Sequence, residues 1–281
     1  MKPDSPGVPA AMDVIERAHL KDPGDASHVM YRYAAAPEFD GLLQRFWVPV
    51  WSVPPGCEAP QRVLQYPVSL LVVAADYARF YGVVSGLSTT TLTGAGWAVG
   101  VMCAPAAGAL IGGAMSGYTD RHVDVPDVLG AEGERLTARV RAAMAPDPHS
   151  PAAHGVAVAA FGDALRPLLP VDDDGRLVND VVAFVEGNRE VVRVSQVCER
   201  FGLSERALQR LAQRRLGLTP KWLIQRRRLQ EAAERLRGDP ASVGEVAAVL
   251  GYADQAHLSR DFARVTGVSP GQFAARHATR S

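Results

Sequence analysis

The sequence predicts an α+β protein with a β-rich, barrel-like N-terminal domain that has a helical extension, and an all-α C-terminal domain. Short β-branched and aromatic runs, broken by turns, extend from Val29 to about Cys103, and helical spacing follows. The charges divide in the same way. Residues 176–281 contain 18 Lys+Arg and 11 Asp+Glu, a net +7, whereas residues 1–175 contain 12 and 19, a net −7. A basic part joined to an acidic part indicates a nucleic-acid-binding domain attached to a different domain.

The individual elements follow from these patterns. Strands are expected at Gln44–Val53, Val63–Ala74, Tyr81–Val84 and Trp97–Cys103. Helices are expected at Ala106–Ile111, Glu132–Met144 and Ala152–Leu169. The polar segment Pro170–Gly175 is the best candidate for a boundary. We therefore expect a mobile leader at 1–27, a sensor-like or dimerisation domain at 28–170, and a DNA-binding domain at 176–281.

Composition argues against several classes of protein. The stretch Phe80–Thr119 carries no charge, but Pro105 and many glycines interrupt it, so buried strands and a short helix fit better than a membrane span. The three cysteines lack CxxC spacing, which indicates neither a disulfide framework nor a zinc site. The N-terminus has no apolar signal-peptide core. We expect a cytoplasmic protein.

The C-terminal part contains an internal repeat. Apolar residues at i, i+3, i+4 and i+7 occur twice, 49 residues apart: Val194, Val197, Cys198 and Phe201, then Val243, Val246, Ala247 and Leu250. Each set is closed by a glycine, Gly202 or Gly251, where a helix ends. A capping residue, Ser204 or Asp254, then opens a second helix. Helix, tight turn and helix form a helix-turn-helix unit, and two of them on the basic part predict double-stranded DNA as the partner.

The outward faces of the two second helices carry side chains suited to DNA. Arg pairs bidentately with guanine and Gln with adenine in the major groove. An Arg or Gln on a helix exterior also needs no ligand, so a plain solvated face remains an alternative for each residue. The candidates are Arg206, Gln209, Arg210 and Gln213 on the first helix, and Gln255, Ala256, His257, Arg260 and Arg264 on the second.

A helix is expected between the two units, from Pro220 to Arg237. At 1.5 Å per residue it spans about 27 Å, close to one DNA turn of about 34 Å. Arg226, Arg227 and Arg228 on this helix are candidate phosphate contacts. A helix surface that is solvated or salt-bridged by neighbouring glutamates is an equally good interpretation of these three residues.

The phrases LSERALQRLAQRRLGLTPKWLIQRRRL and GYADQAHLSRDFARVTGVSPGQF resemble the DNA-binding domain of AraC/XylS-type transcription regulators. The resemblance covers about residues 176–278. It implies seven helices, asymmetric promoter DNA, transcriptional control and RNA polymerase as a partner. By motif position, it implies base contacts from Arg206, Gln209, Arg210, Gln255, Ala256, His257 and Arg260. Ala256 departs from the family pattern because it is too small to hydrogen-bond a base, and so does Ala212, where the family often has a bulky aromatic residue.

Four N-terminal segments resemble a sensor-type domain found in a branch of the same family: Leu42–Trp51, Val83–Gly86, Val99–Met102 and Tyr118–Pro126. This resemblance implies a β-rich, barrel-like fold, a small-molecule effector of undefined class, and a possible homodimer. The candidates for lining an effector pocket are Trp47, Trp51, Tyr66 and Trp97. Aromatic residues in strands are also ordinary core residues, and that alternative stays open.

The sequence predicts no catalytic residues, metal or cofactor. The histidines lack the spacing of metal ligands. Ser85 and Ser116 precede glycines without the flanking pattern of a hydrolase nucleophile. Cys57 lies in Pro-Pro-Gly-Cys-Glu-Ala-Pro, without the neighbouring cations that would favour a thiolate in DNA-alkyl repair. Two alternatives stay open: an effector-free DNA binder whose N-terminal domain docks a protein partner, and an enzyme with a DNA-targeting tail.

Overall fold

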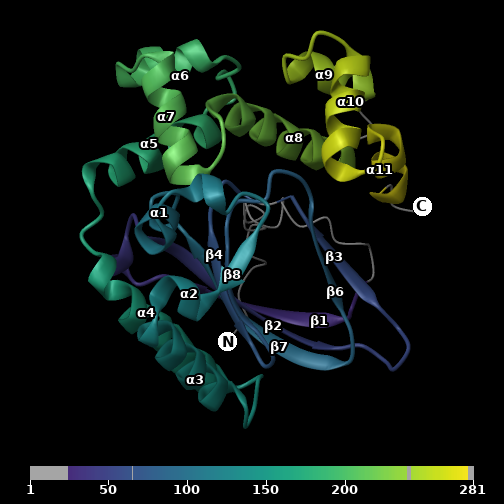
Figure 1. Ribbon diagram of the computed structural model, residues 1–281. Helices are drawn as coiled ribbons and strands as arrows, with labels where there is room; N and C mark the ends of the chain where they lie inside the picture. Colours follow the sequence, from purple (N-terminus) through teal and green to yellow (C-terminus); the bar gives the residue numbers. More distant parts are fainter. Residues whose placement is uncertain (1–24, 65, 239–241, 278–281) are drawn as a thin grey trace, which may run out of the picture.

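The computed structural model describes residues 25–64, 66–238 and 242–277. Residues 1–24 of the leader predicted for 1–27 therefore lie outside the described residues. An N-terminal half built on a sheet is followed by a helical C-terminal half (Figure 1), which confirms the predicted fold class. The strands are β1 (His28–Ala34), β2 (Leu43–Ser52), β3 (Ala59–Val63), β4 (Leu70–Ala74), β5 (Ala78–Tyr81), β6 (Ser88–Leu92), β7 (Ala95–Cys103) and β8 (His122–Asp124).

Six of the strands form one antiparallel sheet in the order β1-β2-β7-β4-β5-β8. The remaining two, β3 and β6, form a separate antiparallel pair. Figure 1 shows this pair beside the main sheet, on the side that lies below the last helices of the chain. The N-terminal half therefore contacts the helical region at both ends: the main sheet packs with α5 (Asp173–Gly187) and α7 (Glu205–Leu216), and Leu64 next to β3 packs with α10 (Gln255–Thr266).

The helices account for the rest of the architecture. The α-helices are α1 (Ala107–Gly112), α2 (Val125–Leu129), α3 (Ala131–Met144), α4 (Pro151–Leu165), α5 (Asp173–Gly187), α6 (Val194–Phe201), α7 (Glu205–Leu216), α8 (Pro220–Gly238), α9 (Val243–Val249), α10 (Gln255–Thr266) and α11 (Pro270–His277). Short 3-10 helices are η1 (Pro37–Phe39), η2 (Met115–Gly117) and η3 (Arg166–Leu168). In the described part of the chain, seven α-helices thus follow the N-terminal half, as the resemblance implied.

The two faces of the sheet have different neighbours because side chains alternate along each strand. Phe46, Val48 and Val50 of β2 are buried in the main core, where the Phe46 ring lies 5.8 Å from the ring of Phe161 in α4, edge to face. The opposite face carries a smaller apolar cluster in which Trp47 and Trp51 are partly buried. Helices α3 and α4 therefore cover one face only.

The main core continues into the helical half. Val178 of α5, Leu208 of α7 and Leu223 of α8 belong to the same buried cluster as the residues of the sheet. Leu258 and Phe262 of α10 lie in a separate cluster at the far end of α8. The first helix-turn-helix unit, α6–α7, thus shares its core with the sheet, whereas the second unit, α9–α10, packs in a separate cluster that also contains Leu64 of the N-terminal half.

The structure differs from the expected elements at several places, and β1, β8 and α2 were not expected. The strand expected at Val63–Ala74 is the end of β3 and the whole of β4, separated by a segment that contains Pro67, which has no backbone N–H for a strand ladder. The strand expected at Tyr81–Val84 ends at Tyr81, and β6 was not expected. Helix α5 begins inside the expected linker, because the Asp172 carboxylate accepts the Gly175 N–H at 3.1 Å and caps the helix.

The uncharged stretch 80–119 forms part of β5, the strands β6 and β7, helix α1 and η2. Among the described residues, no helix is long and apolar enough to cross a membrane.

Candidate DNA-binding surface

The first unit has the local geometry that its sequence predicts. Helix α6 ends at Gly202, which adopts a left-handed conformation with φ +64°. The Ser204 hydroxyl then accepts the Ala207 N–H at 3.2 Å and caps α7. Leu208 is fully buried on the inner side of α7. The predicted turn and cap of the first unit are confirmed.

The second unit repeats this arrangement. Gly251 follows α9 with φ +70°, and the Asp254 carboxylate accepts the His257 N–H at 2.7 Å to cap α10. Leu258 and Phe262 are fully buried on the inner side of α10. The duplicated pattern of the sequence is therefore a duplicated structure, with the same turn and cap at each end of α8 (Figure 1).

The outer faces of α7 and α10 carry the predicted base-contact residues. Those with exposed side chains are Arg206, Gln209, Arg210 and Gln213 on α7, and Gln255, Ala256, Arg260 and Arg264 on α10. His257 is half-buried, with its ring 5.1 Å from the ring of Tyr252. Arg264 is paired with Asp261 at 3.1 Å. The structure therefore brings the predicted residues together as two polar faces.

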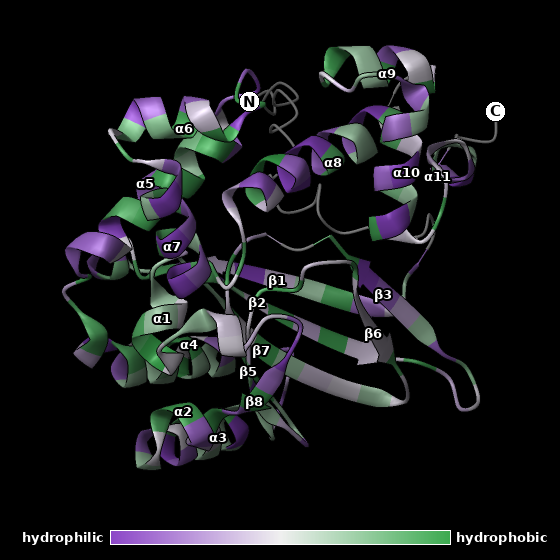
Figure 2. Cartoon of the chain, turned by 45° about the horizontal axis from the view of Figure 1, so that its top comes forward, coloured by the Kyte–Doolittle hydropathy of each residue, from purple (hydrophilic) through white to green (hydrophobic). Residues whose placement is uncertain are grey.

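Helix α8 has 19 residues, which corresponds to about 28 Å, and it joins the two units as expected. Arg226 and Arg227 on this helix do not lie where the phosphate interpretation needs them. Their side chains are only 2% and 3% exposed, so no phosphate of a duplex can reach them in this conformation. Figure 2 colours many residues of α8 as hydrophilic, yet both arginine side chains are buried in the folded chain. Burial thus corrects the prediction for both residues.

Arg227 has partners inside the protein. Its guanidinium pairs with Glu231 at 3.2 Å and donates to the carbonyl oxygens of Arg189 and Val191 at 3.2 and 2.7 Å. The salt-bridge alternative considered for this helix is therefore the correct one for Arg227. Arg227 fastens α8 to the segment that follows α5.

The N-terminal half holds the first unit through contacts on several elements. The Thr119 hydroxyl donates to the Gly217 carbonyl at 2.9 Å, at the end of α7. Trp222 Nε1 donates to the Ser85 carbonyl at 3.0 Å, and Arg215 is ion-paired with Asp172. The Arg215 guanidinium holds the pKa of Asp172 below its ordinary value. The end of α7 is thereby tied to the segment after η2, and the start of α8 is tied to the loop between β5 and β6.

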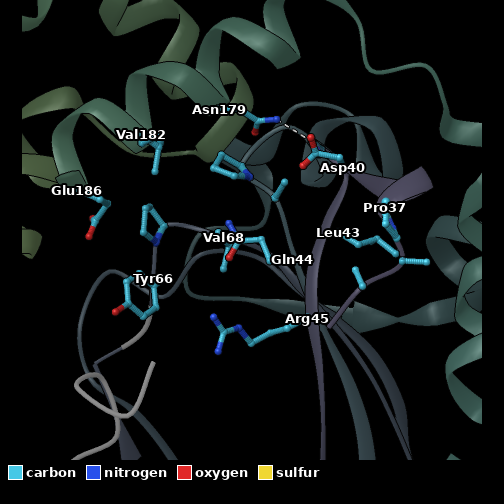
Figure 3. A pocket seen from close by; sticks show the side chains of 17 residues that line it. Pro37, Asp40, Leu43, Gln44, Arg45, Tyr66, Val68, Asn179, Val182 and Glu186 are labelled. Carbon is cyan, nitrogen blue, oxygen red and sulfur yellow. Dashed lines mark hydrogen bonds between the residues drawn. The ribbon is translucent and has the colours of Figure 1, made fainter. Parts of the chain in front are cut away.

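A pocket of about 780 Å³ lies between the sheet and α5 (Figure 3). Arg45, Gln44 and Tyr66 line its N-terminal side, and Asn179 and Glu186 of α5 line the other. Asn179 fixes the junction, because it donates to the Gly41 carbonyl at 2.7 Å and accepts the Ala106 N–H at 2.9 Å. The volume is within the usual range for small-molecule sites.

Glu186 is the unusual titratable group of this pocket. Its Oε1 atom is buried and accepts no hydrogen bond from the described residues. Burial raises the pKa of Glu186 to about 7, against the opposing effect of Arg226 and Arg227. The sequence analysis missed Glu186, Arg45 and Asn179. A glutamate directly after the apolar run Val181–Val185 was the only local signal for Glu186.

Three of the four predicted pocket aromatics, Trp47, Trp51 and Tyr66, pack against one small cluster, whereas Trp97 lies apart from them. Trp97 is buried in the main core, on the opposite face of the sheet from Trp47 and Trp51. The indole of Trp47 covers Gly100 and that of Trp51 covers Gly96, so closely that an added Cβ would lie 2.2 and 2.4 Å from the rings. Tyr66 alone of the four lines the pocket of about 780 Å³. The core interpretation therefore holds for Trp97.

The remaining chemical groups are unremarkable as sites. Cys57 is exposed and Cys103 is buried, and burial raises the pKa of the Cys103 thiol to about 12. Within the described ranges there is no group of three or more His, Cys, Asp or Glu side chains placed to hold a metal ion.

Comparisons with known proteins agree with the geometry of the two units. A family described as "Helix-turn-helix domain" matches residues 197–276, and a "Domain of unknown function (DUF6597)" matches residues 31–124. The HTH-type transcriptional activator RhaS of Escherichia fergusonii is 39% identical over 98 residues, which are 34% of this chain and 35% of that protein. RhaS of Salmonella arizonae is 38% identical over 100 residues, 35% of this chain and 36% of that protein. The chain thus covers only about a third of the length of these curated relatives.

Matches among solved structures include a probable AraC family transcriptional regulator from Rhodopseudomonas palustris. It is 26% identical, and the match covers 36% of this chain and 97% of that one with a TM-score of 0.34. ToxT from Vibrio cholerae is 11% identical, and the match covers 90% of this chain and 98% of that one with a TM-score of 0.39. Together with the matched helix-turn-helix family and the paired, capped units, the RhaS similarity identifies the C-terminal part of this chain as a DNA-binding domain of the AraC/XylS type.

Proposed function

We propose that this chain is a sequence-specific DNA-binding transcription regulator in which α7 and α10 enter successive segments of the major groove. The observation that carries the proposal is the pair of capped units at the two ends of α8, each with Arg and Gln side chains on its outer face. The length of α8, about 28 Å, is close to the rise of one DNA turn, about 34 Å. The names of the curated relatives support regulation of transcription.

The proposed reading residues fall into two groups. Arg206, Gln209 and Arg210 of α7 and Arg260 of α10 have the donors and acceptors that bind base edges. The other proposed contacts are Gln213, Gln255, His257 and Arg264. Ala256 offers no hydrogen bond, so α10 has fewer base contacts to make than α7. Arg226 and Arg227 are not included, because both are buried.

We further propose that the N-terminal half controls the first unit in response to a small-molecule effector. The pocket of about 780 Å³ is the proposed site, since its walls come from both the sheet and α5. A ligand that contacts both walls changes the free energy of their association, and α5 packs on α7 and α8. The buried Oε1 of Glu186, which accepts no hydrogen bond from the described residues, favours a ligand with a hydrogen-bond donor.

The DNA-binding proposal is tested by selecting bound sequences from a random duplex pool and measuring affinity on the selected site. Arg206→Ala and Arg260→Ala should each cost about 1–3 kcal/mol on that site and relax base choice at one position. Arg135→Ala, an exposed arginine of α3, is the matched control for loss of one positive charge. Equal loss on the selected site and on random duplex would reduce the residue to a phosphate contact. Failure of the selection to enrich any sequence would overturn the proposal.

A further inference from the structure

A second pocket, of about 560 Å³, lies where the loop between β5 and β6 meets α8 and α10. Ser85 and Gly86 line it from the N-terminal half, Trp222 and Arg226 from α8, and Asp261 from α10. The loop is held in place because Ser85 donates through its N–H and its hydroxyl to the Asp120 carboxylate, at 2.7 and 2.6 Å. The pocket therefore has walls from the N-terminal half, the connecting helix and the second unit.

Arg226 is the unusual residue of this pocket. Its side chain is only 2% exposed, and none of its three guanidinium nitrogens makes a hydrogen bond with the described residues. Burial lowers the pKa of Arg226 to about 9, which still leaves the group protonated at neutral pH. A buried guanidinium with all its donors unsatisfied is costly, and native proteins rarely keep such a group without an anion or water that pairs with it.

The charges around the pocket favour an anion as the occupant. The cations that line it are Lys221, Arg226 and Arg264, against the single carboxylate of Asp261. Arg264 lies 3.1 Å from Asp261, so this pair is close to neutral, and Gln225 also donates to Asp261 at 2.6 Å. Lys221, which is exposed, and Arg226, which is buried, are left to set a positive potential in the pocket.

Neighbouring groups do not remove this potential. Glu186 is the acidic group that interacts with Arg226, but it lines the other pocket and makes no hydrogen bond or ion pair with the guanidinium. A phosphate of duplex DNA cannot be the occupant in this conformation, because Arg226 is covered from the outside. These observations favour a small molecule as the occupant. Trp222, whose ring centroid lies 5.8 Å from the Arg226 guanidinium carbon, and Leu229 and Val265 give the pocket an apolar wall.

We propose that this pocket binds a small organic anion whose oxyanion group, a carboxylate or a phosphate, pairs with Arg226 and whose apolar part packs against Trp222. Such a ligand contacts the β5–β6 loop, α8 and α10 together, so it stabilises the arrangement in which the second unit lies against the N-terminal half. The consequence for DNA binding rests on the proposed function, whereas the binding of the anion does not.

The test uses the full chain without DNA. Calorimetric titration with 3-phenylpropionate, its neutral analogue 3-phenylpropanamide, and inorganic phosphate separates the charge of the ligand from its apolar part. We expect saturable binding of one 3-phenylpropionate per chain and at least about tenfold weaker binding of the amide, since a charge-assisted hydrogen bond is lost. Phosphate binding of similar strength would identify the oxyanion, rather than the carboxylate with its apolar part, as the recognised group.

Two variants test whether the anion binds at Arg226. Arg226→Met keeps the bulk of the side chain but removes the guanidinium, and it should abolish binding of both anions. Arg135→Gln removes one exposed positive charge from α3, outside the pocket, and should bind like the original chain. Thermal unfolding of each variant without ligand establishes that it is folded before titration. Absence of saturable binding of either anion to the original chain, or unchanged binding to Arg226→Met, would overturn the proposal. Both results are independent of whether the chain recognises any DNA sequence.

Discussion

Gly217 and Gly267 provide a matched pair that measures how strongly the N-terminal half holds the first unit. Each is the glycine that ends the second helix of its unit, and each has a left-handed backbone, with φ +75° and +76°. The surroundings differ. A Cβ added at Gly217 would lie 2.3 Å from Thr119 Oγ1 and 2.6 Å from the Met115 carbonyl oxygen, whereas one added at Gly267 would have no neighbour within 4 Å.

The expected costs follow from this geometry. Gly267→Ala places an L side chain in the left-handed region, which costs about 1–2 kcal/mol. Gly217→Ala has the same conformational cost and also forces η2 away from the end of α7, because the Met115 carbonyl belongs to the backbone and cannot rotate aside. Overpacking of this kind costs about 1–3 kcal/mol more. The total for Gly217→Ala is therefore about 2–5 kcal/mol.

Amide hydrogen exchange followed by mass spectrometry reports the opening free energies of α7 and α10 separately. Gly267→Ala should lower protection in the second unit only. Gly217→Ala should lower it by a larger amount in α7 and also in Met115–Thr119, although those residues are about a hundred positions away in the sequence. Equal losses in the two variants, with no change at Met115–Thr119, would show that the contact between η2 and α7 is not formed in solution, and the reasoning about control of the first unit would fail with it.

Two further predictions concern the buried charges. Because burial raises the pKa of Glu186 to about 7, the folded chain binds a proton that the unfolded chain releases between about pH 4.5 and pH 7, so stability falls as the pH rises through this window. Glu186→Gln should remove this part of the pH dependence of urea unfolding, with exposed Glu190→Gln as the control, and an unchanged slope contradicts it. Arg227→Met should cost about 1–3 kcal/mol of stability, because the Val191 carbonyl loses its donor and Glu231 keeps only its pair with Arg189. The same variant should leave the salt dependence of DNA binding unchanged, and a flattened dependence would make Arg227 a phosphate contact after all.

The sequence predicted the two units well because their signals are local. A glycine that must adopt positive φ, a capping residue two or three positions later and an apolar spacing all lie within about twenty residues. Asp172 shows the limit of the same approach. The sequence places Asp172 in a polar linker, because a run of acidic residues is typical of a linker as well as of a helix N-terminus. In the structure, Asp172 caps α5.

The pockets could not be predicted, because they depend on contacts between residues far apart in the sequence. Gln230 of α8 donates to the Leu64 carbonyl at 3.1 Å, and these residues are 166 positions apart. Nothing near Gln230 in the sequence indicates that the N-terminal half covers this side of α8. Trp47 shows the same limitation on the sheet, since its position over Gly100 depends on the pairing of β2 with β7.

The three consecutive arginines of α8 show how strongly these distant contacts decide the role of a residue. In sequence, Arg226, Arg227 and Arg228 are one basic run, for which phosphate contacts are a reasonable hypothesis. In the structure, Arg227 binds Glu231 and the segment after α5, whereas Arg226 lines a pocket and finds no hydrogen-bond partner among the described residues.

Arg228 turns toward the second unit. It donates to the Leu250 carbonyl at 2.8 Å, and its guanidinium carbon lies 3.8 Å from the centroid of the Tyr252 ring. Successive helix positions are about 100° apart, so a run of three arginines must face three different neighbours when both sides of the helix are covered. Arg227 thus connects α8 to the segment after α5, and Arg228 connects it to the second unit. Arg226, which makes no hydrogen bond with the described residues, is the one left able to bind a ligand.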